Sequence, residues 1–171
     1  MGNRGFKQKN PPERGEKIED RVKSVEEFWK SGKLNINSNV QFGEGGAGTF
    51  SDGKLNTLVK DKENRCKKVF EIFIENGAPE DILYVNKPHI GTDLLRNVIK
   101  NMRNKIISMG GSFRYNTTLT NLIIENNTLK GIIVNDNEKI YTDTLIIAIG
   151  HSARDTFEML YKGNLNMTSK P

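Results

Sequence analysis

The chain has 171 residues, 27% of them charged and 35% hydrophobic, so it is polar for a globular protein but not polar enough to be disordered throughout. No apolar run approaches the roughly 18 residues that cross a bilayer, and no hydrophobic signal region is seen, so we expect a cytoplasmic protein without a membrane partner. The net charge is +5, but 26 lysines and arginines are interleaved with 21 aspartates and glutamates, which argues against nucleic-acid binding.

The first 32 residues are expected to contain a leader and one helix. Residues 1–12 are polar and end in two prolines, which predicts an unstructured leader. From Glu16 to Lys30, apolar residues recur at helical spacing and Gly32 follows as a stop signal, so this segment is predicted to form an amphipathic helix. The expected inner face of this helix consists of Ile18, Val22, Val25, Phe28 and Trp29.

Residues 33–57 form a polar, glycine-rich stretch without periodicity, and loops of this length are uncommon in compact domains unless they carry a function. A G-x-G-x-x-G match begins at Gly43, but no apolar strand precedes it and no helix follows at once, so we reject the dinucleotide fingerprint at this position. A G-x-x-x-x-G-K match ends at Lys54, but Leu55 stands where a P-loop needs Ser or Thr to hold magnesium. An ATP-hydrolysing loop is therefore rejected too.

Two physical properties of this stretch remain after those rejections. Successive glycines permit positive φ and let the backbone approach a ligand closely, and neighbouring N–H groups can form an anion-binding nest. Thr49, Ser51 and Lys54 add hydrogen-bond donors and a positive charge. The stretch is therefore a candidate ligand-binding loop, and a flexible surface loop is the alternative.

Two more helices are predicted in the middle of the chain. One runs from about Lys60 to Asn76 with Cys66 on its apolar stripe, so this thiol is expected to be a core residue and not a nucleophile. The other begins at Thr92 and ends at Gly110. Its inward residues are expected to be Leu95, Ile99, Met102, Ile106 and Met109. With one cysteine and two distant histidines, we expect neither a disulfide nor a metal site.

After residue 111 the pattern changes from helical periodicity to short strands. Strands are predicted at residues 112–115, 119–125, 129–134 and 139–141. Turns are expected at Asn126-Asn127 and at Asp136-Asn137. Because the connections are so short, the strands are predicted to form an antiparallel meander.

The uninterrupted apolar run Leu145 to Ile149 is typical of a strand that is buried on both faces of a parallel sheet. Gly150 follows, and Ser152 can cap a helix from Ala153 to about Tyr161. This order places a turn at the carboxyl end of a buried strand, where α/β sheets bind ligands. A plain turn from strand to helix is the alternative.

Three separated blocks, at residues 43–55, 87–93 and 148–157, carry a specific resemblance. They resemble segments of the uncharacterised bacterial FAD-dependent (NAD/FAD-utilising) dehydrogenases, a family in the glutathione-reductase-like flavoprotein superfamily. Glu13-Arg14-Gly15, followed by Phe28-Trp29, is similar to the segment after the second sheet strand of that family. The resemblance covers residues 13–171.

The resemblance implies an α/β fold, namely a partial FAD-binding domain of the Rossmann-like, glutathione-reductase type that lacks the first βαβ unit and contains a β-meander. Within residues 13–171 it implies four parts. These are a cofactor loop region at 13–57, a helical segment at 58–111, the β-meander at 112–144 and a strand-turn-helix unit at 145–161.

The resemblance also implies cofactor contacts. Glu13 resembles the acid that hydrogen-bonds the adenosine ribose of FAD, the 43–54 loop resembles the segment around the pyrophosphate and isoalloxazine, and the strand at Asn121-Leu122 resembles the one whose backbone touches adenine. Residues 148–152 resemble the second glycine motif. The implied cofactor-binding residues are Glu13, Gly43, Gly45, Gly46, Ala47, Gly48, Thr49, Ser51, Asp52, Lys54, Leu122, Ala148, Gly150, His151 and Ser152.

These contacts imply an oxidoreductase, a dehydrogenase in which FAD carries the redox chemistry, NAD(P)H is a candidate electron donor and the substrate is an unknown small molecule. The sequence departs from the family because residues 1–12 supply neither the expected first strand nor its glycine turn. The chain therefore resembles an internal fragment of a longer protein. A truncated, non-catalytic fragment or binding module without activity of its own is the alternative, and the catalytic residues and the oligomeric state are left open.

Overall fold

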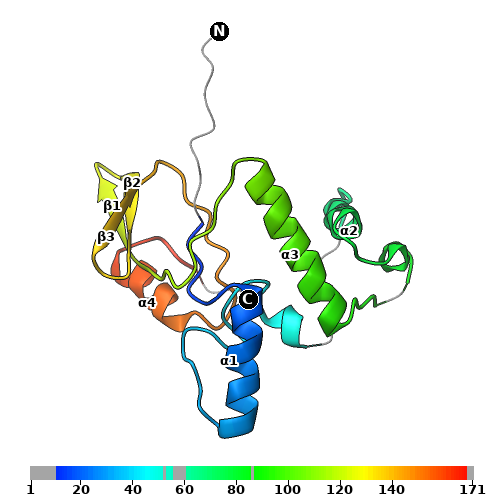
Figure 1. The fold of residues 1–171 in the computed structure, drawn as a ribbon. Helices are drawn as coiled ribbons and strands as arrows, with labels where there is room; N and C mark the ends of the chain where they lie inside the picture. The colour runs from blue at the N-terminus through cyan, green and yellow to red at the C-terminus, as the bar shows by residue number, and fades with distance from the viewer. Residues whose placement is uncertain (1–10, 52, 56–60, 86, 169–171) are drawn as a thin grey trace.

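The computed structural model describes residues 11–51, 53–55, 61–85 and 87–168. The expected leader up to residue 10, Asp52 and the predicted helix start at Lys60 lie outside the described residues. Figure 1 shows a small sheet with helix α4 at one side of the molecule, helices α2 and α3 at the other, and α1 below them. Loop segments fill the region between these two groups.

The four predicted helices are present, with their ends shifted by a few residues. The helices are α1 (Ile18–Ser31), α2 (Arg65–Glu75), α3 (Thr92–Ser108) and α4 (Arg154–Lys162), and two short 3-10 turns are η1 (Ala47–Phe50) and η2 (Glu80–Leu83). Helix α1 ends at Gly32, which has a φ of 73° as a C-terminal glycine should. Helix α2 begins later than predicted, because the Asp61 carboxylate accepts hydrogen bonds from the backbone N–H groups of Arg65 and Cys66.

The hydrophobic core lies between α2, η2 and α3. Its fully buried members are Ala78, Ile82, Ile90, Leu95 and Val98. The prediction for α3 was right for Leu95, whereas Ile99 and Met102 are partly buried against this core. It was wrong for Ile106 and Met109, which lie at the C-terminal end of α3 and are 38% and 70% exposed. Cys66, which was expected in the core, is only half-buried, and burial together with the nearby Asp61 raises the pKa of its thiol.

The predicted β-meander is confirmed. Strands β1 (Leu119–Glu125), β2 (Thr128–Val134) and β3 (Glu138–Tyr141) form one antiparallel sheet in the order β1-β2-β3. Asn126 and Asn127 form the first turn, with φ values of 48° and 60°. The second turn has positive φ at Asn135 and Asp136, one residue earlier than the predicted pair.

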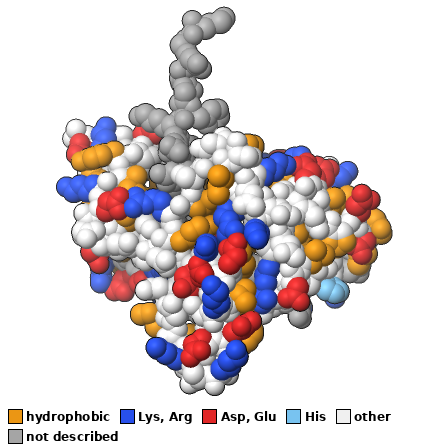
Figure 2. Space-filling view, viewed as in Figure 1, with side chains coloured by type: hydrophobic (Ala, Val, Ile, Leu, Met, Phe, Trp, Pro, Cys, Tyr) orange, Lys and Arg blue, Asp and Glu red, His pale blue; other side chains and the backbone are white. Residues whose placement is uncertain are grey.

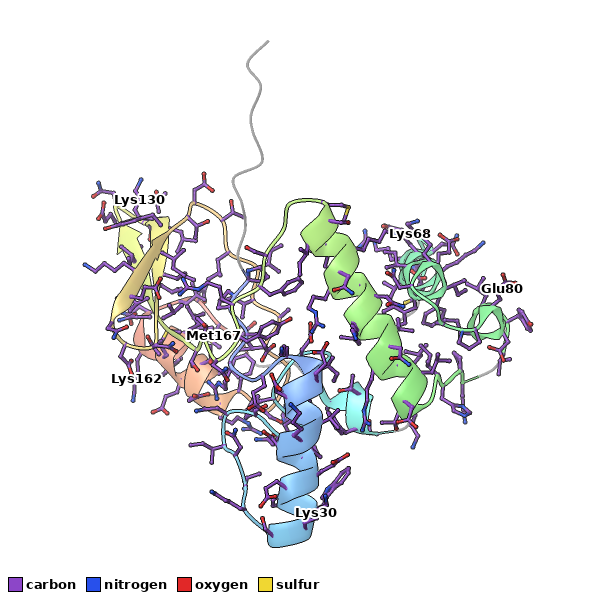
Figure 3. The ribbon with its side chains drawn as sticks, viewed as in Figure 1. Lys30, Lys68, Glu80, Lys130, Lys162 and Met167 are labelled. Atoms are coloured by element: carbon purple, nitrogen blue, oxygen red, sulfur yellow. The ribbon has the colours of Figure 1, made fainter. Side chains whose placement is uncertain are left out.

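Helix α4 packs against β1. The buried residues on this side of the molecule are Ile132 and Val134 from β2 and Ala153, Thr156 and Leu160 at or within α4. Figure 3 shows Lys130 and Lys162 directed outward at this end of the molecule, and Lys68 and Glu80 directed outward at the opposite end. Lys, Arg, Asp and Glu side chains are interleaved across the face seen in Figure 2.

Two predicted strands do not form. Residues 145–149 contain no strand, and Ile146 is 84% exposed. A strand in a parallel sheet requires paired edges, and no hydrogen bond joins the backbone of 145–149 to another segment within the described residues. In place of the strand predicted at 112–115, the chain makes an isolated parallel bridge between Pro12 and Arg114.

The fold is therefore mixed α/β with a small antiparallel sheet. The more specific expectation, a Rossmann-like FAD-binding domain, is kept as a proposal below. Among the described helices, none has the length and apolar character needed to cross a membrane.

Candidate functional site

In the glycine loop, defined here as residues 43–51, the backbone changes direction sharply at its glycines. Gly43, Gly45 and Gly46 have φ values of 118°, 85° and 67°, a region in which side chains other than glycine are strained. Gly43, Glu44 and Thr49 are buried, whereas residues 45–47 are exposed. We call these three exposed residues the loop crest. The loop thus presents a glycine-rich backbone at the surface on a buried base.

Arg21, on α1, fixes the base of this loop from inside. Its side chain is fully buried, and its Nε donates to the carbonyl oxygen of Asn39 at 2.9 Å. Its Nη1 donates to several loop oxygens. These are the carbonyl oxygens of Glu44 at 2.6 Å, Gly46 at 2.9 Å and Gly43 at 3.2 Å, and Oγ1 of Thr49 at 2.9 Å. A single guanidinium group therefore links four residues of the loop, which are Gly43, Glu44, Gly46 and Thr49.

The environment of Arg21 is strongly desolvated. Burial lowers its pKa to about 10, although the nearby Glu13 and Glu44 partly oppose this effect. Its guanidinium carbon lies 4.7 Å from the ring centroid of Phe50, and that of Arg96 lies 4.8 Å from the same centroid. Nη2 of Arg21 finds no hydrogen-bond partner among the described residues, and the contact with Phe50 offers it a π face instead.

A second, partly buried group, the Glu44 cluster, consists of Glu19, Glu44, Arg103 and Tyr115. Oε2 of Glu44 accepts from Nη1 of Arg103 at 2.6 Å and from the backbone N–H of Ile18 at 2.7 Å. Oε1 of Glu44 accepts from the Tyr115 hydroxyl at 2.5 Å, and Arg103 also pairs with Glu19. Glu44 thus caps the first turn of α1, where the helix dipole favours a negative charge.

These contacts shift the pKa values of the cluster. Burial raises the pKa of Tyr115, and its hydrogen bond to Glu44 raises it further. The hydrogen bond from Arg103 lowers the pKa of Glu19, while the same bond raises the pKa of Arg103. At neutral pH these three shifts favour a protonated Tyr115, an ionised Glu19 and a protonated Arg103. These are the states in which the three groups make the contacts described above. The cluster is therefore structural support for the loop and does not itself reach the loop crest.

Glu13 and Gly15 lie beside the glycine loop. Oε1 of Glu13 accepts from the backbone N–H of Gly15 at 2.9 Å. A Cβ atom at Gly15 would lie 2.5 Å from Cα of Gly43, so this position requires glycine. The structure therefore places the segment that contains Glu13 against the base of the loop, through Gly15.

Arg14 connects this segment to α4. Its Nη2 pairs with Oδ2 of Asp155 at 2.5 Å and donates to Oγ1 of Thr156 at 3.3 Å, while its guanidinium carbon lies 4.8 Å from the ring centroid of Phe42. Burial would raise the pKa of Asp155, but the hydrogen bonds from Arg14 and from the backbone N–H of Thr156 lower it. The start of α4 is thereby connected through one arginine to Phe42, the residue directly before the glycine loop.

The turn before α4 is exposed, and its details differ from the prediction. Gly150 has a φ of 71°, and Ala148 and His151 are exposed. Nε2 of His151 lies 3.0 Å from Nη2 of Arg154. Ser152 does not cap the helix, because Ala153 occupies the N-cap position and no side chain caps it.

The remaining predicted residues lie elsewhere. Lys54 forms an antiparallel bridge with His89, and Oγ of Ser51 donates back to the carbonyl oxygen of Ala47 at 3.2 Å. Leu122 pairs with Ile132 within the sheet. A hollow of about 390 Å³ lies nearby, lined by Asn121, Asp155, Glu158, Met159, Lys162 and Gly163. The contacts described above therefore place Glu13 near the glycine loop through Gly15, but include neither Leu122 nor residues 148–152.

Sequence reasoning missed Arg21, Glu44, Arg103 and Tyr115. Two of these four residues could have been recognised from the sequence pattern. Arg21 lies three residues after Ile18 and four before Val25, in phase with the apolar stripe of α1, and a charged residue in such a stripe indicates a buried partner. Arg103 is similarly placed four residues after Ile99 in α3. Glu44 and Tyr115 lie in irregular segments, where no periodicity identifies them.

No family model matches this chain. An uncharacterised protein of Clostridium beijerinckii is 50% identical over 158 residues. The match covers 92% of this chain but 29% of the Clostridium protein, so the chain spans less than a third of the length of that relative.

Proposed function

We propose that this chain is part of an FAD-dependent oxidoreductase, in which the glycine loop contacts the cofactor. The observation that supports the proposal most is the loop crest, a glycine-rich backbone that is exposed at residues 45–47 and held from below by the buried Arg21. Binding to a preorganised loop costs less conformational entropy than binding to a mobile loop, and this favours ligand affinity.

The residues present fit a phosphate-containing cofactor at the crest. A Cβ atom at Gly46 would have no atom within 4 Å, so a ligand can approach the backbone there. The Gly46 position also has a φ of 67°, and Glu13 lies beside the base of the loop. In the proposal, the crest holds the phosphate groups and Glu13 binds a ribose hydroxyl. FAD would supply the electron or hydride transfer, with NAD(P)H as a candidate donor and a small molecule as substrate.

A second candidate function, a fragment without activity of its own, is favoured by a specific observation. Ile146 and Ile147 in the apolar run at 145–149 are exposed, and the turn at 148–152 makes no described contact with the loop crest. The relative that shares this sequence is more than three times as long as the shared part. In this reading the loop contributes to a cofactor site that other segments complete.

The visible absorbance spectrum after incubation with FAD and removal of free flavin tests the first proposal. Retained absorbance near about 450 nm, the usual position of a bound flavin, would support it, and NAD(P)H oxidation would be assayed next. A colourless, folded protein would contradict flavin binding by this chain alone and favour the second candidate.

Two alanine variants make the spectrum specific to the loop crest. Gly46→Ala and Gly32→Ala both place a side chain at a positive φ, of 67° and 73°, where no atom lies within 4 Å. The backbone strain is therefore matched, but Gly32 ends α1 and lies outside the loop. We expect Gly46→Ala to weaken FAD binding at least about 10-fold, by blocking the close approach that glycine allows, and Gly32→Ala to leave it unchanged. Equal effects of the two variants would place the flavin elsewhere.

A further inference from the structure

Residues 87–93 have no part in the proposed function so far, yet the structure pairs them with the glycine-rich stretch. Lys54 and His89 form an isolated antiparallel bridge. Two backbone hydrogen bonds of 3.0 and 3.1 Å flank this bridge and join residues 53–55 to residues 88–90. Two of the three sequence blocks that carry the family resemblance therefore meet at one pair of residues.

The bridge determines the direction of both side chains. Because the hydrogen bonds flank the pair, Lys54 and His89 are non-hydrogen-bonded partners. The side chains of such partners lie on the same face, with Cβ atoms about 4.5–5.5 Å apart. The next residue on each side, Leu55 and Ile90, belongs to the hydrophobic core. Since direction alternates along extended backbone, Lys54 and His89 are directed away from the core, and both are exposed.

An ammonium and an imidazole in this arrangement suit an oxyanion. Both can donate to the same group, and hydrogen bonds with charged partners are the stronger ones. An ammonium has three N–H donors, so Lys54 can bind an oxyanion alongside another contact. Helix α3 begins directly after Gly91, and its positive dipole end adds to the attraction. Asp93 in the first turn opposes it, but Arg96 donates to the Asp93 carboxylate at 3.3 Å.

The pair lies well away from the loop crest, because the glycine-rich stretch runs along α3. A Cβ atom at Gly45 would lie 3.2 Å from Cγ1 of Ile99, and a Cβ atom at Gly53 would lie 3.2 Å from the backbone nitrogen of Gly91. Ile99 follows Gly91 by eight residues, which is about 12 Å along a helix. An oxyanion at His89 is therefore a different group from the phosphates that the proposed function places at the crest.

We propose that His89, together with Lys54, binds the carboxylate of an organic-acid substrate. The assignment to the substrate rests on the proposed function, in which the phosphates of the cofactor occupy the crest. A carboxylate has two oxygens, so it can accept from both side chains at once. A phosphate group has the same oxyanion chemistry, and the experiment below separates the two.

Proton NMR of the histidine C2–H signals tests the site in the 171-residue chain, which has two histidines. His151 is exposed like His89 but lies in the turn before α4, so it serves as the internal control. His89→Gln and His151→Gln assign the two signals. At constant ionic strength, sodium acetate should shift the His89 signal saturably, with half-saturation below about 100 mM, and should leave the His151 signal unshifted.

The same titration is repeated with inorganic phosphate and with FAD. A shift with phosphate or FAD but none with acetate would overturn the carboxylate assignment. Equal shifts of both histidines, or no saturable shift, would overturn the site even in a chain that retains flavin. An acetate shift in a chain that retains no flavin would support the site and contradict the proposed function.

A pair of lysine variants provides the second test, with the His89 signal as the readout. Lys54→Gln and Lys130→Gln each remove one exposed positive charge, but Lys130 is directed outward from the small sheet (Figure 3). Lys54→Gln should raise the acetate concentration at half-saturation at least about 5-fold, because it removes a charged donor. Lys130→Gln should leave it unchanged. Equal effects of the two variants would show a general charge effect and overturn the proposal.

Discussion

Arg21 is buried in a position that α1 would normally give to an apolar residue. Loop carbonyl oxygens converge on it, and a planar guanidinium with several fixed N–H groups can satisfy them at once, which a lysine ammonium cannot. The burial that lowers its pKa to about 10 still leaves it protonated at neutral pH. The loop conformation therefore depends on one charged side chain more than on packing between apolar groups.

Tyr115 occupies a similar structural position on the other side of the loop. Its hydroxyl donates to Glu44 at 2.5 Å, and burial together with this carboxylate raises its pKa above the ordinary tyrosine value. A raised pKa means that the folded state binds the phenolic proton more tightly than the unfolded state does. The stability gained in this way is fully present below the unfolded-state pKa of about 10, and it is lost as pH rises through the folded-state pKa.

We predict that an alkaline titration followed by tyrosinate absorbance will show a late component, which ionises above the ordinary tyrosine range and belongs to Tyr115. The chain has four tyrosines, and Tyr84, Tyr141 and Tyr161 are all more than 70% exposed. Tyr115→Phe should remove the late component, and Tyr84→Phe should leave it in place. A late component that persists in Tyr115→Phe would contradict the assignment. Above pH 10, wild type should also lose stability faster than Tyr115→Phe.

Helices and strands whose signals lie close together along the chain were predictable from the sequence. The apolar stripes of α1 and α3 identified both helices, and the asparagine turns identified the meander, because these signals lie within a few residues of one another. The prediction was less accurate at the helix ends. The Asp61 carboxylate accepts from the backbone N–H of Arg65 at the start of α2, and Ile106 and Met109 at the end of α3 are exposed.

The candidate site was less predictable, because distant contacts determine it. The glycine loop was identified from its composition, but its base depends on Arg21 and Arg103 from two helices. Residues 145–149 have the composition of a buried strand, yet a strand forms when another segment pairs with it, and composition alone does not supply that segment. Composition therefore drew attention to both segments, but the conformation of each depends on its tertiary partners.

The turn between β1 and β2 allows a test at the scale of one element. Asn126 and Asn127 both have positive φ, as a two-residue hairpin turn of type I′ requires, and glycine is favoured in its second position. We predict that Asn127→Gly will raise the free energy of unfolding by up to about 1 kcal/mol, because glycine adopts this conformation without strain. Asn127→Ala should lower it. Urea denaturation of both variants measures the effect, and a decrease for both would show that the asparagine side chain is itself required.

At the scale of the whole molecule, polar contacts connect two parts that share little hydrophobic core. The hydrophobic cluster lies between α2, η2 and α3, and the sheet packs with α4 at the other side (Figure 1). Among the described residues, eleven hydrophobic residues are buried, whereas eighteen large ones are exposed. Apolar burial is therefore modest, and the ionic contacts between the two parts carry more of the connection than in a domain with one large core.

The Glu44 cluster is central to that connection, since it joins α1, α3 and the segment that leads into β1. We predict that wild type unfolds in one transition, with the fluorescence of Trp29 on α1 and the hydrogen exchange of β2 changing together. Glu44→Ala should lower the free energy of unfolding by about 3 kcal/mol, because it leaves Arg103 without one of its two carboxylate partners. It should also separate the two signals.

Glu138→Ala is the matched control, since it removes a carboxylate that pairs with Arg114 at the surface through bonds of 2.6 and 2.7 Å. If Glu44→Ala still unfolds in a single transition, the two parts are coupled through contacts other than this cluster.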